Sequence, residues 1–300
     1  MSKKIITNKQ KIILTLLYTF RFVNSKQIQE LLGHKDHRRI NSWLKDLVEK
    51  GYIERDFTPV FGTLTKPAIY YLTAKGRKYI KSAYTYHFPK YLKRIARDNK
   101  ASKAFRIRCQ IIVDWYLLLF SPGLTMVEKD TRKNTSESKT GIEILDYLIH
   151  ELTIGKKEEA QIDTIHFFTP ANFPDFILIE KMKPDAYVQR RITNDIIHGF
   201  HFVFDAYIPR FLLKYTLKRI FDTLDYEYWE DETINSLHIF FLCPNHQIII
   251  YIQRLLPSFL QGYYGRSPLV FHMATRNQLY KRKSGITEKV GWINFSSTDY

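Results

Sequence analysis

The sequence predicts an α+β protein built from two parts. Over the first third, apolar residues recur at helical spacing and are followed by two short β-rich segments. From residue 141 onward, helical and strand-like segments alternate, a pattern typical of a mixed sheet flanked by helices. Charge separates the parts as well, because residues 1–110 carry 25 Lys and Arg against 7 Asp and Glu, whereas residues 111–300 carry 21 against 23. The basic excess therefore lies in the first third, where it favours a polyanionic partner.

The first third is expected to begin with three helices, in residues 8–20, 24–33 and 36–51. In the third helix, the apolar positions that fall on one face are Ile40, Trp43, Leu44, Leu47 and Val48. The opposite face then carries Arg38, Arg39, Asn41, Ser42 and Lys45. We expect this helix to bury Trp43 and to present its basic and polar side chains to solvent.

Residues 52–57 and 68–73 are β-rich, and the turn residues between them predict a hairpin. Three helices followed by a hairpin is the order of a winged helix-turn-helix domain, expected here over residues 1–85. In a major groove, Arg pairs with guanine, Asn with adenine, and Lys and Ser with phosphates. The residues expected to contact DNA are His37, Arg38, Arg39, Asn41, Ser42 and Lys45 on the third helix, and Thr63, Thr65 and Lys66 at the hairpin tip. The alternative is a domain of this order that contacts only proteins.

Residues 86–140 are expected to form a basic connecting helix and a polar loop. The basic segment extends the DNA-contacting surface, forms a solvated connector, or packs two protomers together, and the sequence leaves these three interpretations open. Residues 141–300 are expected to form the α/β domain. Helices are predicted at 141–152, 209–224 and 245–256, and strands at 160–168, 175–181, 186–192, 199–208, 237–244 and 269–280.

Short motifs add a family resemblance to this organisation. "PDAYV", "FHFVFDAY", "RFLLKYTLKRIFDTL" and "IFFLCPN", placed after a winged helix and a connecting helix, resemble the replication-relaxation family of plasmids and integrative elements. The resemblance implies that a winged helix is joined to a restriction-endonuclease-like domain with the PD-(D/E)xK nuclease fold. It further implies a DNA-binding factor in plasmid replication, supercoil state or mobilisation, and by itself it does not imply catalysis.

A nuclease of this kind needs acidic side chains that converge on Mg²⁺, and usually a lysine near the attacking water. Asp185 and Asp205 are the candidate metal ligands and catalytic acids, but Tyr207 stands where the pattern has lysine. Lys214 or Lys218, on the next helix, is the candidate replacement. Because the lysine is displaced and no further acid accompanies Asp205, we expect a catalytically inactive domain that needs no cofactor. The alternative is a Mg²⁺-dependent endonuclease or nickase delivered by the winged helix.

The expected partner is double-stranded DNA, read with sequence selectivity. A homodimer and plasmid replication or transfer proteins are further expected partners, because the near-neutral second part favours protein contacts over DNA. A transcriptional repressor without a replication role would have the same sequence features. No apolar run approaches the roughly 18–20 residues that span a bilayer, and two well-separated cysteines fit free thiols, so a cytoplasmic protein without membrane contact is expected.

Overall fold

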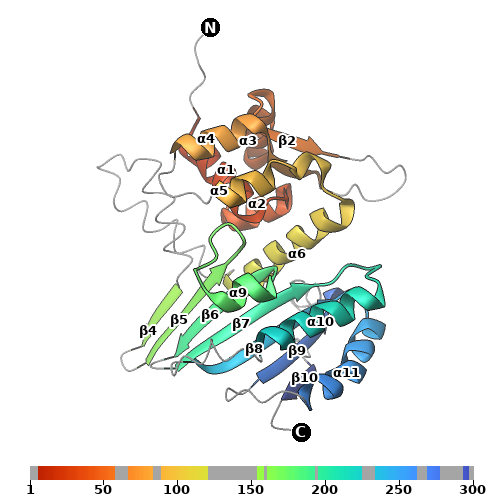
Figure 1. Ribbon diagram of the computed structural model, residues 1–300. Coiled ribbons are helices and arrows are strands. Elements are labelled where there is room, and N and C mark those ends of the chain that lie inside the picture. Colours follow the sequence, from red (N-terminus) through yellow and green to blue (C-terminus); the bar gives the residue numbers. More distant parts are fainter. Residues whose placement is uncertain are drawn as a thin grey trace. The chain divides into compact units, whose positions relative to one another are not determined.

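A computed structural model describes residues 6–57, 67–83, 89–120, 154–158, 161–192, 195–224, 234–261, 269–277 and 293–296. The chain divides into two compact units, Met1–Glu151 and Leu152–Tyr300, and each is described by itself. Helices dominate the first unit, and one large mixed sheet organises the second (Figure 1). The prediction of an α+β protein is confirmed.

The first unit opens with α1 (Asn8–Phe20), β1 (Val23–Asn24), α2 (Ser25–Leu31) and α3 (His37–Glu49). The strands β2 (Ile53–Asp56) and β3 (Ile69–Leu72) follow, and then α4 (Ala74–Ala83). The strand order is β1-β3-β2, with antiparallel pairing throughout. The predicted succession of three helices and two paired strands is therefore observed, and the two-residue β1 is an element that the sequence pattern did not predict.

Local chemistry explains where these helices begin and end. The side chains of Thr7 and Asn24 cap α1 and α2, and a glutamine three residues later completes a capping box in each. Asp36 caps α3 by accepting a hydrogen bond from the backbone N–H of Arg38 at 2.8 Å. Past the end of α3, Gly51 has φ +72°, a left-handed conformation that glycine adopts without steric cost.

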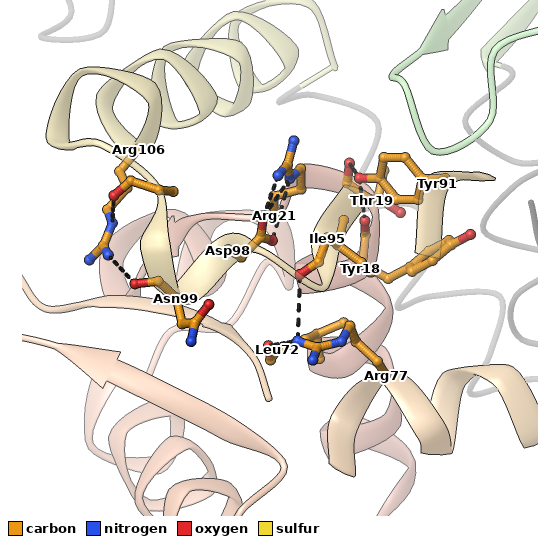
Figure 2. Close-up of polar contacts among 11 residues, drawn as sticks. Tyr18, Thr19, Arg21, Leu72, Arg77, Tyr91, Ile95, Asp98, Asn99 and Arg106 are labelled. Carbon is orange, nitrogen blue, oxygen red and sulfur yellow. Dashed lines mark hydrogen bonds and ion pairs between the residues drawn. The ribbon is translucent and has the colours of Figure 1, made fainter. Parts of the chain in front are cut away.

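The basic connecting segment packs against the preceding helices of the first unit. It forms α5 (Pro89–Ile95), the short 3₁₀ helix η1 (Asp98–Lys100) and α6 (Lys103–Phe120). The Tyr91 hydroxyl donates to the carbonyl of Tyr18 at 2.8 Å, and the guanidinium of Arg21 binds the Asp98 carboxylate through two nitrogens (Figure 2). On α6, Asp114 accepts a hydrogen bond from the Gln27 side chain at 2.9 Å. Of the three interpretations of this segment, a connector surrounded by solvent does not match these contacts.

The second unit is built on a seven-stranded sheet with the order β10-β9-β8-β7-β6-β5-β4. β7 pairs in parallel with β8 and β8 with β9, whereas the other neighbours are antiparallel. The strands are β4 (Ile154–Glu158), β5 (Gln161–Phe168), β6 (Ala186–Ile192), β7 (Asp195–Val203), β8 (Ile234–Cys243), β9 (Leu269–Thr275) and β10 (Ile293–Ser296). The helices are α9 (Ile177–Met182), α10 (Arg210–Leu224) and α11 (His246–Leu260).

Several features of this unit differ from the sequence prediction. The strand predicted at 199–208 begins earlier and ends at Val203, so Asp205 and Tyr207 follow it. Residues 175–181 were expected to form a strand, but Ile177–Met182 is the helix α9, whose Leu178 and Met182 are buried in the core. A short apolar run fits a strand and a buried helical turn equally well, and packing decided between them. The strands β4 and β10 were not predicted. The helix predicted at 141–152 lies outside the described residues.

One face of the sheet forms the core with α10 and α11. Phe200, Phe202, Phe241 and Phe271 from this face are buried together with Leu217 and other apolar side chains of the two helices. Alternate residues of β7, β8 and β9 point to the opposite face, which carries His201, Phe240 and His272. None of the described helices is long and apolar enough to cross a membrane.

Candidate nucleic-acid interface

The outward face of α3 carries all six of the side chains predicted there. Ile40, Leu44 and Leu47 are at most 1% exposed and anchor the helix in the core of the first unit. The exposed side chains are His37, Arg38, Arg39, Asn41, Ser42 and Lys45. The amphipathic period of the sequence therefore correctly separated the buried and the exposed faces of this helix.

Trp43 is an exception to the predicted burial. It is half-buried, and its ring meets the His34 ring edge-to-face with a centroid distance of 5.2 Å. The loop that precedes α3 therefore packs on Trp43, which fixes the start of the helix beside its basic residues. His34 also bonds with the backbone N–H of Asp36 at 3.1 Å, so this histidine belongs to the local turn.

Acidic residues flank the basic part of α3 without neutralising it. Asp36 caps the N-terminus, and Glu49, at the other end, lies 3.9 Å from the Lys45 ammonium. The Lys45 and Glu49 side chains are 79% and 60% exposed, so this ion pair is weak and leaves Lys45 available to another anion. Arg38 and Arg39 lie on the turn that follows the cap. The predicted wing residues Thr63, Thr65 and Lys66 lie outside the described residues.

The two candidate acids of the second unit lie at the same end of the sheet. Asp185 immediately precedes β6, and Asp205 follows β7, the strand paired with it. The Asp185 carboxylate accepts a hydrogen bond from the backbone N–H of Val203 at 2.9 Å, and the Asp185 N–H donates to the His201 carbonyl at 2.8 Å. Asp185 thus continues the pairing of β6 with β7, which gives this side chain a structural use.

The candidate lysines Lys214 and Lys218 lie on α10, the helix that follows Asp205. Lys218 binds Asp222 one helical turn away at 2.7 Å, and both side chains are largely exposed. Lys214 is exposed on the same helix, and Tyr207, at the position of the expected lysine, is 96% exposed. In the parts of the chain that the structure describes, no three His, Cys, Asp or Glu side chains are grouped so as to hold a metal ion.

Three histidines, His201, His238 and His272, form a layer on the sheet that was not predicted from the sequence. His238 and His272, on the neighbouring strands β8 and β9, share a hydrogen bond of 2.7 Å, and the His201 ring stacks on Phe240 at 4.4 Å. Burial, reinforced by His272, lowers the pKa of His201 to about 3 and that of His238 to about 4. Each of the strands β7, β8 and β9 contributes one of these histidines, and only the register between the strands shows that they share a face.

Comparison with protein families bears on the first unit. Residues 14–114, from within α1 to within α6, match the model of the replication-relaxation family. The similarity to this family extends over about a third of the chain. The match confirms the resemblance noted from the sequence, and it suggests a role in the replication or relaxation of a plasmid or mobile element. No match to the chain was found among curated proteins or among solved structures.

The replication-relaxation match ends before the second unit begins. It includes α3 with its exposed basic face, and it also includes α5, η1 and the greater part of α6. The segment that packs through Arg21 and Asp98 is therefore inside the family region, together with the helices it contacts.

Proposed function

We propose that this protein binds double-stranded DNA with sequence selectivity and acts in the replication, relaxation or transfer of a plasmid or mobile element. The first unit is a winged helix in this proposal, and α3 is its recognition helix. The observation that carries the proposal is the outward face of α3, where Arg38, Arg39, Asn41 and Lys45 stand exposed on a helix anchored by Ile40 and Leu44.

Geometry and charge support this function together. A helix anchored on one side leaves its other side to enter a major groove, where exposed Arg and Asn pair with base edges. The excess of 25 basic over 7 acidic residues in positions 1–110 supplies the attraction to phosphates. The family match supports the biological setting, because it covers this same segment.

In this proposal the second unit is a nuclease-like scaffold without catalytic activity that serves protein contacts or oligomerisation. Three observations favour an inactive scaffold. Asp185 is engaged with the Val203 backbone, Lys218 is engaged with Asp222, and Tyr207 replaces the expected lysine. A transcriptional role on the same DNA site is compatible with the same recognition helix.

The test of DNA recognition begins with a binding site selected from random duplexes by the intact protein. Arg38→Ala combined with Arg39→Ala should weaken binding to that duplex by about 10-fold or more, because each bidentate arginine–guanine pair contributes about 1–3 kcal/mol. The slope of log K against log salt should also become shallower by about one for each phosphate that the variant no longer neutralises.

A charge-matched control is available on the second unit. Lys181→Ala combined with Arg191→Ala removes the same charge from two exposed positions on α9 and β6 and should leave duplex affinity unchanged. Equal affinity of the Arg38/Arg39 variant and the unaltered protein would refute α3 as the recognition helix. Equal weakening in both double variants would refute a localised interface.

The inactivity of the second unit has its own test. Supercoiled plasmid incubated with the protein and Mg²⁺ or Mn²⁺ should remain supercoiled. Nicking that disappears in both Asp185→Asn and Asp205→Asn would refute the scaffold role and establish the endonuclease alternative. Asn retains the hydrogen-bond acceptor that Val203 uses, so Asp185→Asn tests charge more than folding.

A further inference from the structure

The outer face of α10 carries large aromatic side chains that the core does not use. Phe211 and Tyr215 are 71% and 62% exposed, and Tyr207, just before the helix, is 96% exposed. On the inner side of the same helix, Leu213 and Leu217 are fully buried. Because a folded protein normally covers most of a ring of this size, three such rings within nine residues indicate a surface that another molecule covers.

Basic side chains lie beside these rings. Phe211 and Tyr215 are one turn apart on α10, and Lys214 and Lys218 follow the same spacing on the adjacent strip of the helix. Arg210 is also exposed, and its guanidinium carbon lies 5.3 Å from the centre of the Tyr251 ring on α11. Lys218 is engaged with Asp222, so Arg210 and Lys214 are the cations best placed to meet an anionic partner.

We propose that this α10 surface, formed by Tyr207, Arg210, Phe211, Lys214 and Tyr215, binds single-stranded nucleic acid. Exposed aromatic rings stack on unpaired bases of any sequence, and neighbouring cations neutralise the phosphates between them. Phe211 and Tyr215 are separated by one helical turn, a rise of about 6 Å, which an extended strand can follow. The surface is additional to α3, which the proposed function assigns to the duplex.

The charge of the α10 surface selects this partner over a second copy of the chain. Two α10 helices packed face to face would bring the Arg210 and Lys214 side chains of both copies together and desolvate them, because Asp222, the acid of this helix, is engaged with Lys218. Lysine is also depleted in the buried centre of protein interfaces. Residues 111–300 have no basic excess, so the cations on α10 are a local feature and not part of a uniformly positive surface.

The experiment measures binding of a labelled oligothymidine, which forms no base pairs, by fluorescence anisotropy. The intact protein carrying Arg38→Ala and Arg39→Ala serves as background, so that binding through α3 is weakened. In this background, Phe211→Ala combined with Tyr215→Ala should weaken oligothymidine binding by about 10-fold or more, since each stacked base contributes about 5- to 150-fold in affinity. Lys214→Gln should weaken it less and reduce its salt dependence.

Two control variants separate stacking from a general change of the surface. Ile177→Ala removes a side chain that is 42% exposed on α9 and should leave affinity unchanged, whereas Phe211→Trp should retain or strengthen binding. A strand that carries 5-iodouracil, photo-crosslinked to the protein, should label the peptide that contains Tyr207, Phe211 or Tyr215. All the substituted side chains are exposed, so circular dichroism should show the same fold in each variant.

Several results would overturn the proposal. The background protein could fail to bind oligothymidine, the Phe211/Tyr215 variant could bind it with unchanged affinity, or the crosslinks could be confined to the first unit. A fall in molar mass of the Phe211/Tyr215 variant, with strand binding intact, would assign the surface to a second copy of the chain. Loss of binding to anionic vesicles alone would assign it to a lipid surface. Duplex selectivity through α3 is measured separately, so either proposal can fail without the other.

Discussion

Within the first unit, the buried ion pair between Arg21 and Asp98 is expected to hold the segment from α5 to α6 against the end of α1. Asp98 is 2% exposed and Arg21 is 18% exposed, so removing the carboxylate leaves a guanidinium that water reaches poorly. Arg21 also has φ +66°, a strained conformation for a residue with a side chain, and Asp98 helps to hold it there. Figure 2 shows how the pair joins the end of α1 to η1.

The size of the effect follows from these exposures. Breaking a buried pair by removing one partner costs about 3–5 kcal/mol, and the residual exposure of Arg21 places Asp98→Ala near the lower end, about 3 kcal/mol. Burial raises the pKa of Asp98 even though Arg21 opposes the shift, as expected for a carboxylate that is costly to desolvate. Replacing both partners, as Arg21→Gly with Asp98→Ala, should therefore cost less than Asp98→Ala alone, because glycine also relieves the positive φ.

Hydrogen exchange measured by mass spectrometry on peptides of α1 and α6 reports the opening of this unit separately from the sheet unit. Asp98→Ala should accelerate exchange in the most protected amides by about 10²-fold, since about 1.36 kcal/mol corresponds to a factor of ten. Glu49→Ala, which breaks the exposed pair with Lys45 in the same unit, is the matched control and should change exchange by less than about five-fold. Equal effects of the two substitutions would refute the reasoning, as would a double variant less stable than Asp98→Ala.

Two further predictions concern packing and pH. Gly76→Ala should destabilise the first unit by about 1–3 kcal/mol, because the added Cβ would lie 2.2 Å from the carbonyl oxygen of Tyr52. Ser82→Ala, on the same helix, is the control, and unfolding of both variants at the same urea concentration would contradict this prediction. Burial lowers the pKa of His201 to about 3, so between pH 6.5 and pH 3 the unfolded chain binds a proton there that the folded chain does not. The free energy of unfolding that is present above pH 6.5 is therefore lost as the pH falls towards 3. In urea denaturation, His201 should contribute roughly 2 kcal/mol to the loss of stability of the second unit between pH 7.5 and pH 5, and His238 adds to that loss. An unchanged pH dependence in His201→Phe would show that other groups are responsible.

The structure follows the sequence prediction most closely where the prediction depended on local spacing. The three helices of the first third appear within a few residues of their predicted bounds, because capping residues and glycines mark their ends. The exposed side chains of α3 were predicted one by one from the helical period. Trp43 was misjudged because burial at the edge of a helix face depends on the neighbouring loop, here the turn at His34.

Elements of the second unit were less predictable because their state depends on what packs against them. Residues 177–182 have the composition of a strand, yet they form a helical turn whose buried face contacts the core. Asp185 and Asp205 were correctly placed beside paired strands, but the sequence did not reveal that Val203 uses the Asp185 carboxylate. Such a contact depends on the register between β6 and β7, which no local pattern encodes.

The sequence alone determined the basic first third, the family resemblance and the face that α3 presents to solvent. Charge, motif and helical period are properties of neighbouring residues. Tertiary structure alone decided that Arg21 pairs with Asp98, 77 positions away, and that the histidines of three strands lie together. It also left the rings of α10 uncovered. Which side chains meet, and which stay exposed, depends on how distant segments pack, and packing is a property of the whole fold.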